Sequence, residues 1–280
     1  MTDPGSGRAV LVTGASSGIG EATALHLERI GFRVFAGHRR PEDGERLRER
    51  GGEGLEPIRI DVTDEAEIAA AAERIGDRLY GLVNNAGIPV PGAVELLPLD
   101  DLRRQLEVNV IGAVAVTQAM LPKLRPAKGR ILNVTSVGGR VATPYMSAYH
   151  ASKFALEAVS DSLRRELVPQ GVDVIAIEPG SIATPIWRKG TDHAADREIP
   201  PELEPLYGKE LDTALKAAVE TGERGLEPEA AAEVIATALT AGRPRPRYLV
   251  GRDARGAVAA QAVLPTRVFD RLMRRAMGFP

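Results

Sequence analysis

The apolar positions of this chain gather in seven short runs, and longer segments with a helical repeat separate them. Each run is rich in Val, Ile and Leu and lacks the alternation of apolar and polar residues that marks a half-exposed strand, so we expect strands buried on both faces. The runs begin at Ala9, Arg33, Glu56, Gly81, Arg130, Val172 and Arg247. The helical segments cover residues 18–30, 41–50, 64–75, 99–124, 147–168 and 228–241.

This alternation of strands and helices predicts an α/β fold with a doubly wound, parallel, seven-stranded sheet. A helix that joins two parallel strands crosses the sheet with a right-handed turn, and successive crossovers place helices on both faces. No linker interrupts the series, so we predict a single domain over residues 1–280. In such sheets ligands bind at the carboxyl ends of the strands.

Two segments depart from the alternation. Residues 185–226 follow the carboxyl end of a predicted strand and are rich in Pro, Gly and charge, which is typical of a mobile substrate lid rather than a second domain. Residues 254–280 end in a basic amphipathic helix that carries Val268, Leu272 and Met273 among arginines. This helix could cover the core, pack across an oligomer interface or lie on an anionic membrane. We favour packing, because the segment is short and modestly apolar.

Composition narrows the function to a cytoplasmic enzyme or a binding protein. The formal net charge of −2 gives no excess of positive charge that would bind the phosphates of nucleic acid. The chain has no cysteine, which excludes disulfides and thiolate chemistry and fits a reducing compartment. The first residues resemble no signal peptide, and no apolar stretch reaches the roughly 20 residues that span a bilayer. The four histidines form no metal-ligand pattern, so we expect no catalytic metal.

The stretch VTGASSGIGEATALHL joins the first predicted strand to the first predicted helix. Gly14, Gly18 and Gly20 remove side chains where the turn is tight, where the backbone approaches a phosphate and where the helix packs on the strand. The amide dipole of the helix then faces the pyrophosphate. Between a strand and a helix, this turn favours a Rossmann-type dinucleotide site over a plain tight turn.

A second candidate site lies at the start of the predicted helix 147–168. Tyr149 and Lys153 are four residues apart and therefore lie side by side on one face of that helix. Taken alone, the pair reads as a surface cation beside a half-buried ring. Whether the pair is instead catalytic depends on the other motifs of the chain.

These motifs resemble those of the short-chain dehydrogenase/reductase family. They are T-G-x-x-x-G-I-G (13–20), N-N-A-G (84–87), Asn109, Ser136, Y-x-x-x-K (149–153) and P-G-x-x-x-T (179–184), in the order of that family over roughly residues 8–184. The surroundings of Tyr149 are most similar to those in the hydroxysteroid and retinol dehydrogenase branch. The resemblance implies a nicotinamide-dependent oxidoreductase that acts on an alcohol and its ketone or aldehyde.

The resemblance also implies a role for each cofactor-binding position. Tyr149 and Lys153 would border the nicotinamide and its ribose. The other expected residues are Ser16, Ser17 and Ile19 with the loop glycines at the pyrophosphate, Asp61 and Val62 at the adenine, Asn85, Ala86 and Gly87 at the ribose, and Pro179, Gly180, Ile182 and Thr184 at the nicotinamide.

The end of the second predicted strand favours NADP(H) over NAD(H). Relatives that prefer NAD carry an Asp there to bind both ribose hydroxyls, whereas this chain has His38 followed by Arg39 and Arg40. A guanidinium binds a 2′-phosphate in a bidentate manner, and a carboxylate would repel it. We expect Arg39 to be the main contact. Ser17 stands where many NADP-using relatives have a basic residue, so NAD(H) remains the alternative.

For catalysis we expect Tyr149 to be the general acid/base. A phenol has a pKa of about 10, and a cation one helical turn away favours the phenolate, so we expect Lys153 to lower the pKa of Tyr149. Ser136 would hold the substrate oxygen. Asn109 would position a water that connects Lys153 to solvent. No nucleophile elbow or His–Asp pair accompanies Ser136, which argues against acyl transfer.

The substrate is expected to be hydrophobic, because apolar residues flank the predicted site. They are Val137, Val141, Pro144, Ile186 and Trp187, and ordinary packing under the lid would explain them equally well. The alternatives are a reductase of polar or acyl-carrier-linked ketones and a dinucleotide-binding redox sensor without turnover. Family resemblance further implies a homodimer or homotetramer.

Overall fold

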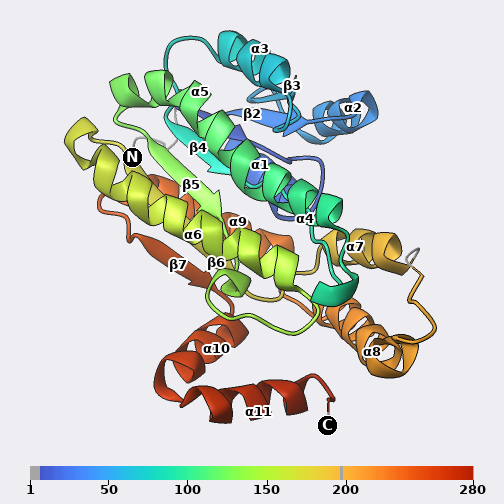
Figure 1. Ribbon diagram of the computed structural model, residues 1–280. Coiled ribbons are helices and arrows are strands. Elements are labelled where there is room, and N and C mark those ends of the chain that lie inside the picture. Colours follow the sequence, from blue (N-terminus) through green and yellow to red (C-terminus); the bar gives the residue numbers. More distant parts are fainter. Residues whose placement is uncertain (1–6, 196–197, 280) are drawn as a thin grey trace.

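A computed structural model of the chain describes residues 7–195 and 198–279. Over these residues, seven parallel strands form one sheet in the order β3-β2-β1-β4-β5-β6-β7 (Figure 1). The strands are β1 (Ala9–Val12), β2 (Arg33–His38), β3 (Leu55–Arg59), β4 (Gly81–Asn84), β5 (Arg130–Val134), β6 (Asp173–Pro179) and β7 (Arg247–Val250). The predicted fold class is confirmed.

Helices cover both faces of the sheet, and each face has its own apolar core. Successive side chains of a strand point to opposite faces, so Val10 and Val12 of β1 contact one core and Leu11 contacts the other. The first core packs under α1 and α9, the second under α3, α5 and α6. The helices are α1 (Gly18–Arg29), α2 (Pro41–Arg50), α3 (Glu65–Ile75), α4 (Leu99–Leu106), α5 (Gly112–Ala127), α6 (Ser147–Leu167), α7 (Ile186–Ala195), α8 (Glu204–Glu223), α9 (Pro228–Thr240), α10 (Arg252–Val263) and α11 (Thr266–Ala276).

One predicted helix, 99–124, is interrupted in the structure. α4 ends at Leu106, a π-helical turn spans Glu107–Ile111, and α5 continues to Ala127. A π-turn inserts an extra residue into the helical hydrogen-bond ladder and frequently occurs at functional sites. Here it carries the buried Asn109. The hydrophobic repeat continues on both sides of the turn, so the sequence pattern does not reveal it.

The lid segment and the C-terminal extension are both helical. Residues 185–226 contain α7 and α8, and two helices follow β7 where the sequence predicted one. Pro265 precedes α11 and separates it from α10, because a proline cannot continue a helix. In Figure 1, α10 and α11 lie beside the end of the sheet from which α8 also projects. None of the helices in the described part of the chain combines the length and the hydropathy that a membrane span needs.

Candidate active site

A cavity of about 230 Å³ lies at the carboxyl ends of the strands, where the strand order reverses between β1 and β4. The connections that follow these two strands leave toward opposite faces, which opens a crevice between them. The loop between β1 and α1 forms one wall, and Gly14 and Gly18 adopt positive φ angles of 63° and 56° there. Ser17 precedes α1 without capping it through its side chain. The first amides of α1 are therefore free to bind an anion.

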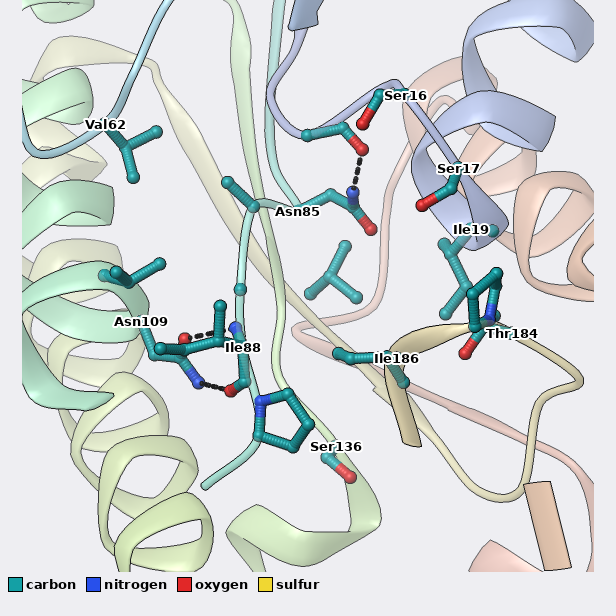
Figure 2. A pocket seen from close by; sticks show the side chains of 18 of the residues that line it. Ser16, Ser17, Ile19, Val62, Asn85, Ile88, Asn109, Ser136, Thr184 and Ile186 are labelled. Atoms are coloured by element: carbon teal, nitrogen blue, oxygen red, sulfur yellow. Dashed lines mark hydrogen bonds between the residues drawn. The ribbon is translucent and has the colours of Figure 1, made fainter. Parts of the chain in front are cut away.

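The segment after β4 holds the glycine loop in place. Asn85 Nδ2 donates hydrogen bonds to the carbonyl oxygens of Thr13 (3.0 Å) and Gly14 (3.1 Å), and the Thr13 hydroxyl accepts the N–H of Asn85 at 3.0 Å. The side chain of Asn85 thus points toward the loop (Figure 2). Gly20 lies behind the loop, where a Cβ atom would overlap the Gly14 carbonyl oxygen. A residue without a side chain at position 20 therefore allows α1 to pack closely against the loop.

Apart from Gly20, every residue that the sequence assigns to cofactor or catalysis lines this cavity. They are Gly14, Ser16, Ser17, Gly18, Ile19, His38, Arg39, Asp61, Val62, Asn85, Ala86, Gly87, Asn109, Ser136, Tyr149, Lys153, Pro179, Gly180, Ile182 and Thr184. The motif residues are therefore brought together. The wall also includes Thr135 and Ile88, which sequence reasoning missed because they belong to no motif.

Tyr149, Lys153 and Ser136 meet in this cavity, and all three are buried. Tyr149 and Lys153 stand one turn apart near the start of α6. Lys153 Nζ donates to the carbonyl oxygen of Val134 at the end of β5 (2.9 Å) and lies 5.7 Å from the centre of the Tyr149 ring. Ser136 Oγ accepts the N–H of Gly138 at 3.0 Å, which fixes the hydroxyl at the start of a 3₁₀ turn. The predicted juxtaposition is present.

Burial favours the neutral forms of both side chains, which corrects one prediction. We expected Lys153 to lower the pKa of Tyr149. Instead, burial raises the pKa of Tyr149 above its ordinary value, and the hydroxyl of Ser136 opposes this rise. Burial also lowers the pKa of Lys153 to about 8, although the nearby Glu157 acts in the opposite direction. Charged groups lose solvation when buried, so both shifts favour the neutral side chains.

Asn109 and Gln105 clamp the loop that follows β4. Asn109 Oδ1 accepts the N–H of Ile88 at 2.8 Å, and its Nδ2 donates to the Ile88 carbonyl oxygen at 3.0 Å (Figure 2). The same Nδ2 donates to Ser152 Oγ at 3.1 Å. Gln105, one turn earlier, donates to the same carbonyl (2.7 Å) and accepts the N–H of Val90 (2.7 Å). The side chain of Asn109 is therefore fully engaged. Sequence reasoning missed Gln105, since nothing in its local pattern distinguishes it.

The basic residues after β2 differ in their surroundings. Arg39 lines the cavity, is 64% exposed and lies 3.9 Å from Asp61 Oδ2. Arg40 instead pairs with Asp43 at 2.9 Å. Arg46 of α2, which the sequence did not single out, donates to the carbonyl oxygen of Ser16 and ties α2 to the glycine loop. Of these three guanidinium groups, that of Arg39 is the one placed on the cavity wall.

A second cavity of about 290 Å³ adjoins the first and is mostly apolar. The residues common to both are Ser136, Tyr149, Gly180 and Trp187. Of the predicted substrate residues, Val137, Val141, Pro144 and Trp187 line the second cavity, and Ile186 lines the first. Residues of α8, α10 and α11 also contribute to its wall. The sequence did not indicate this contribution of the C-terminal helices.

Comparison with known proteins places this geometry in a family. Residues 8–195 match the sequence model of short chain dehydrogenases. The chain is 38% identical to retinol dehydrogenase 5 of Mus musculus, over 96% of this chain and 89% of the mouse protein. It is 37% identical to 17-beta-hydroxysteroid dehydrogenase type 6 of Bos taurus, over 97% and 89% of the two chains.

Solved structures agree with the sequence relatives. A short-chain dehydrogenase from Streptomyces avermitilis superposes with a TM-score of 0.79 at 29% identity, over 98% of both chains. Another, from Burkholderia cenocepacia J2315 in complex with NADP, superposes with a TM-score of 0.76 at 28% identity, over 95% of this chain and 98% of the other. This chain therefore belongs to the short-chain dehydrogenase family, in the branch of the hydroxysteroid and retinol dehydrogenases.

Proposed function

We propose that this protein is an NADP(H)-dependent oxidoreductase that interconverts a hydrophobic alcohol and its ketone or aldehyde. One observation carries the proposal: Ser136 and Tyr149 line both the cavity under the glycine loop and the apolar cavity beside it. A substrate in the second cavity would thus meet these two hydroxyl groups next to a dinucleotide in the first. Membership of a dehydrogenase family supports the same reaction class.

The walls of the first cavity fit a dinucleotide. The positive φ angles of Gly14 and Gly18 bring backbone to the surface without a side chain, and the uncapped start of α1 suits a pyrophosphate. Thr184, Ile182 and Gly180 line the same cavity as Tyr149 and would seat the nicotinamide. A bound nicotinamide dinucleotide would supply the hydride.

Tyr149 would supply the proton for the substrate oxygen. Its raised pKa keeps the proton on the phenol until negative charge develops on that oxygen, which is the behaviour required of a general acid. The hydroxyl of Ser136 would hold the same oxygen with a hydrogen bond. Lys153, with a pKa of about 8, exchanges protons near neutrality and would restore the proton of Tyr149.

Asn109 would act through its main chain rather than its side chain. Both side-chain groups are engaged by Ile88 and Ser152, so a water between Lys153 and solvent would bind the backbone of the π-turn. The side chain itself holds the loop beside the cofactor cavity.

Arg39 supports a preference for NADP(H). Its exposed guanidinium on the cavity wall would bind a phosphate in a bidentate manner, and the Burkholderia cenocepacia relative is an NADP complex. Asp61, 3.9 Å away, would repel the same phosphate, which leaves NAD(H) as the alternative.

The substrate proposed here is a retinoid- or steroid-like alcohol or carbonyl compound. The second cavity is mainly apolar, and the relatives above are a retinol dehydrogenase and a hydroxysteroid dehydrogenase by name. A reductase of acyl-carrier-linked ketones would need a polar channel for a thioester, and a redox sensor would need no substrate at all.

Oxidation of NADPH by the purified protein tests the proposal. The panel contains decanal, retinal, a steroid ketone and an acetoacetyl thioester, each with NADPH and with NADH. We expect turnover with one or more of the three hydrophobic carbonyl compounds and a higher kcat/KM with NADPH. Turnover confined to the thioester would favour the acyl-carrier alternative, and dinucleotide binding without turnover on any carbonyl would favour the sensor.

A further inference from the structure

The outer wall of the second cavity is built by the C-terminal helices. Ser136 and Tyr149 line both this cavity and the first one. Met273 of α11 and Met277, the residue that caps the end of that helix, lie on the wall of the second cavity together with Ala214 and Ala218 of α8. α11 lies outside the residues that match the family's sequence model, which end at residue 195. Ser136 and Tyr149 thus lie within the part of the chain that matches the family model, whereas α11 lies outside it.

α11 presents one face to the cavity and another to solvent. Met273 and Met277 are four residues apart and lie one turn apart on the same face, and both line the cavity. Leu272, next to Met273 in sequence, is 49% exposed and does not line it. The arginines of this helix are exposed as well. The two methionines are therefore the large apolar side chains that α11 gives to the cavity.

Arg274 of α11 and Phe279 after it attach this segment to the rest of the molecule, at two residues that also bond each other. Arg274 lies 3.6 Å from the carboxylate of Glu210 on α8, and the hydroxyl of Tyr145 donates to that same carboxylate at 2.7 Å. The Phe279 ring, only 4% exposed, meets the Tyr145 ring edge-on with 5.7 Å between centres. Tyr145 adopts a left-handed backbone conformation, with φ of 62°, which costs energy and persists only where surrounding contacts enforce it. The wall is thus fixed in position relative to Tyr149.

We propose that Met273 and Met277 are specificity-determining residues, and that they set the size and shape of the apolar substrate that reaches Tyr149. This inference rests on the proposed function, in that it takes the second cavity as the substrate site. A methionine side chain is flexible and polarizable, so it adapts to the surface of an apolar ligand. The cavity of about 290 Å³ lies at the lower limit of the volumes that ligand sites span, about 300–1,000 Å³. One apolar molecule would fill it, and added wall volume would exclude rigid ligands first.

Substitution by phenylalanine tests the assignment with a matched control on the same helix. Met273→Phe and Met277→Phe add volume to the wall, and Leu272→Phe adds similar volume on the exposed face. The probes are androstenedione, a rigid four-ring ketone, and decanal, a slender flexible aldehyde. Binding is followed through the fluorescence of Trp187, the only tryptophan of the chain, which lines both cavities. Titrations are made with NADP⁺ present, and thermal unfolding verifies that each variant is folded.

We expect the methionine variants to bind androstenedione about tenfold more weakly, which corresponds to about 1.4 kcal/mol, since overpacking of a filled site is unfavourable. Decanal should bind within about threefold of the wild type, because a flexible chain can bend around the added ring, and Leu272→Phe should change neither affinity. Equal effects of all three variants, no effect of either methionine variant, or a wild type that binds neither probe would overturn the inference. A wild type that binds both probes but reduces neither would overturn the proposed function alone.

Discussion

At the residue scale, burial acts on Tyr149 and Lys153 in opposite directions. It raises the pKa of the phenol and lowers that of the ammonium to about 8. A phenol whose pKa is raised does not fit the simple view that a lysine cation makes the tyrosine acidic. It fits a tyrosine that holds its proton for the substrate and a lysine that titrates close to neutral pH. The local spacing of the two residues reveals their contact but not their degree of burial.

The lowered pKa of Lys153 makes stability depend on pH. Between pH 8 and 10.5 the unfolded chain still binds a proton that the folded protein has lost, so the contribution of Lys153 to the free energy of unfolding rises with pH over this range. The full rise is roughly 3 kcal/mol, from 1.36 kcal/mol per pKa unit. The Lys153→Met variant should lack this rise, because it has no ammonium group to titrate at this position. Urea unfolding from below pH 8 to above pH 10.5 measures the difference.

The control for this prediction is Lys216→Met, which removes an exposed lysine (71% exposed side chain). Its unfolding free energy should follow the wild-type curve throughout. If the wild type and Lys153→Met gave parallel curves, Lys153 would titrate at its ordinary pKa and would not be the proton reservoir described above.

Arg39 carries the prediction about cofactor choice. Arg39→Asp replaces a phosphate ligand by a carboxylate, so the ratio of kcat/KM for NADPH to that for NADH should fall about 10- to 100-fold, which corresponds to the roughly 1.5–3 kcal/mol of a charge-assisted hydrogen bond. Steady-state kinetics with both dinucleotides measures the ratio. Arg48→Asp, on the exposed side of α2, serves as the charge-matched control. An unchanged ratio in Arg39→Asp would show that the phosphate is recognised elsewhere.

The sequence predicted those residues that lie in local motifs, and it missed those that reach the site through tertiary contacts. Gly14, Asn85 and Lys153 each stand in a short stretch whose spacing is informative by itself. Arg46 and Gln105 approach from α2 and α4, and their contacts with Ser16 and Ile88 depend on how these helices pack. No local pattern encodes such contacts.

At the element scale, the break between α4 and α5 positions the loop beside the cofactor cavity. The π-turn at Glu107–Ile111 directs Asn109 to the backbone of Ile88, and Gln105 binds the same loop from the preceding turn. Two amide side chains thus satisfy backbone groups that would otherwise be buried without partners. The sequence predicted the helical segment correctly, but an inserted residue within a helix leaves no hydrophobic signature.

Gln105→Ala should therefore destabilise both the loop and the fold. It leaves the N–H of Val90 without its acceptor, and an unsatisfied buried polar group costs about 1–3 kcal/mol. Urea unfolding should show this loss, and the KM for the dinucleotide should rise because the loop lines its cavity. Gln118→Ala, on the exposed side of α5, should change neither quantity. A Gln105→Ala variant as stable as the wild type would contradict the clamp.

At the scale of the whole molecule, the parallel sheet could be predicted and the C-terminal wall could not. Buried strands appear as continuous apolar runs, such as the one that begins at Arg130, and strand–helix alternation then determines the architecture. α11 carries a strong amphipathic pattern, but the pattern does not say what its apolar face meets. That face meets the second cavity because Phe279 and Arg274 attach the helix to Tyr145 and Glu210. The lid of residues 185–226 and the oligomeric state stay predictions.

The central claim is that Tyr149 donates the proton at the junction of the two cavities. Tyr149→Phe removes that hydroxyl and keeps the ring, and Tyr80→Phe removes a hydroxyl that bonds Leu239 on the other side of the sheet. The direct measurement is the rate of NADPH oxidation with a hydrophobic carbonyl substrate, beside NADPH binding to the same samples. We expect Tyr149→Phe to bind NADPH normally and to be slower by about 10²- to 10⁴-fold, with Tyr80→Phe close to the wild type. A Tyr149→Phe enzyme that keeps wild-type turnover would contradict it.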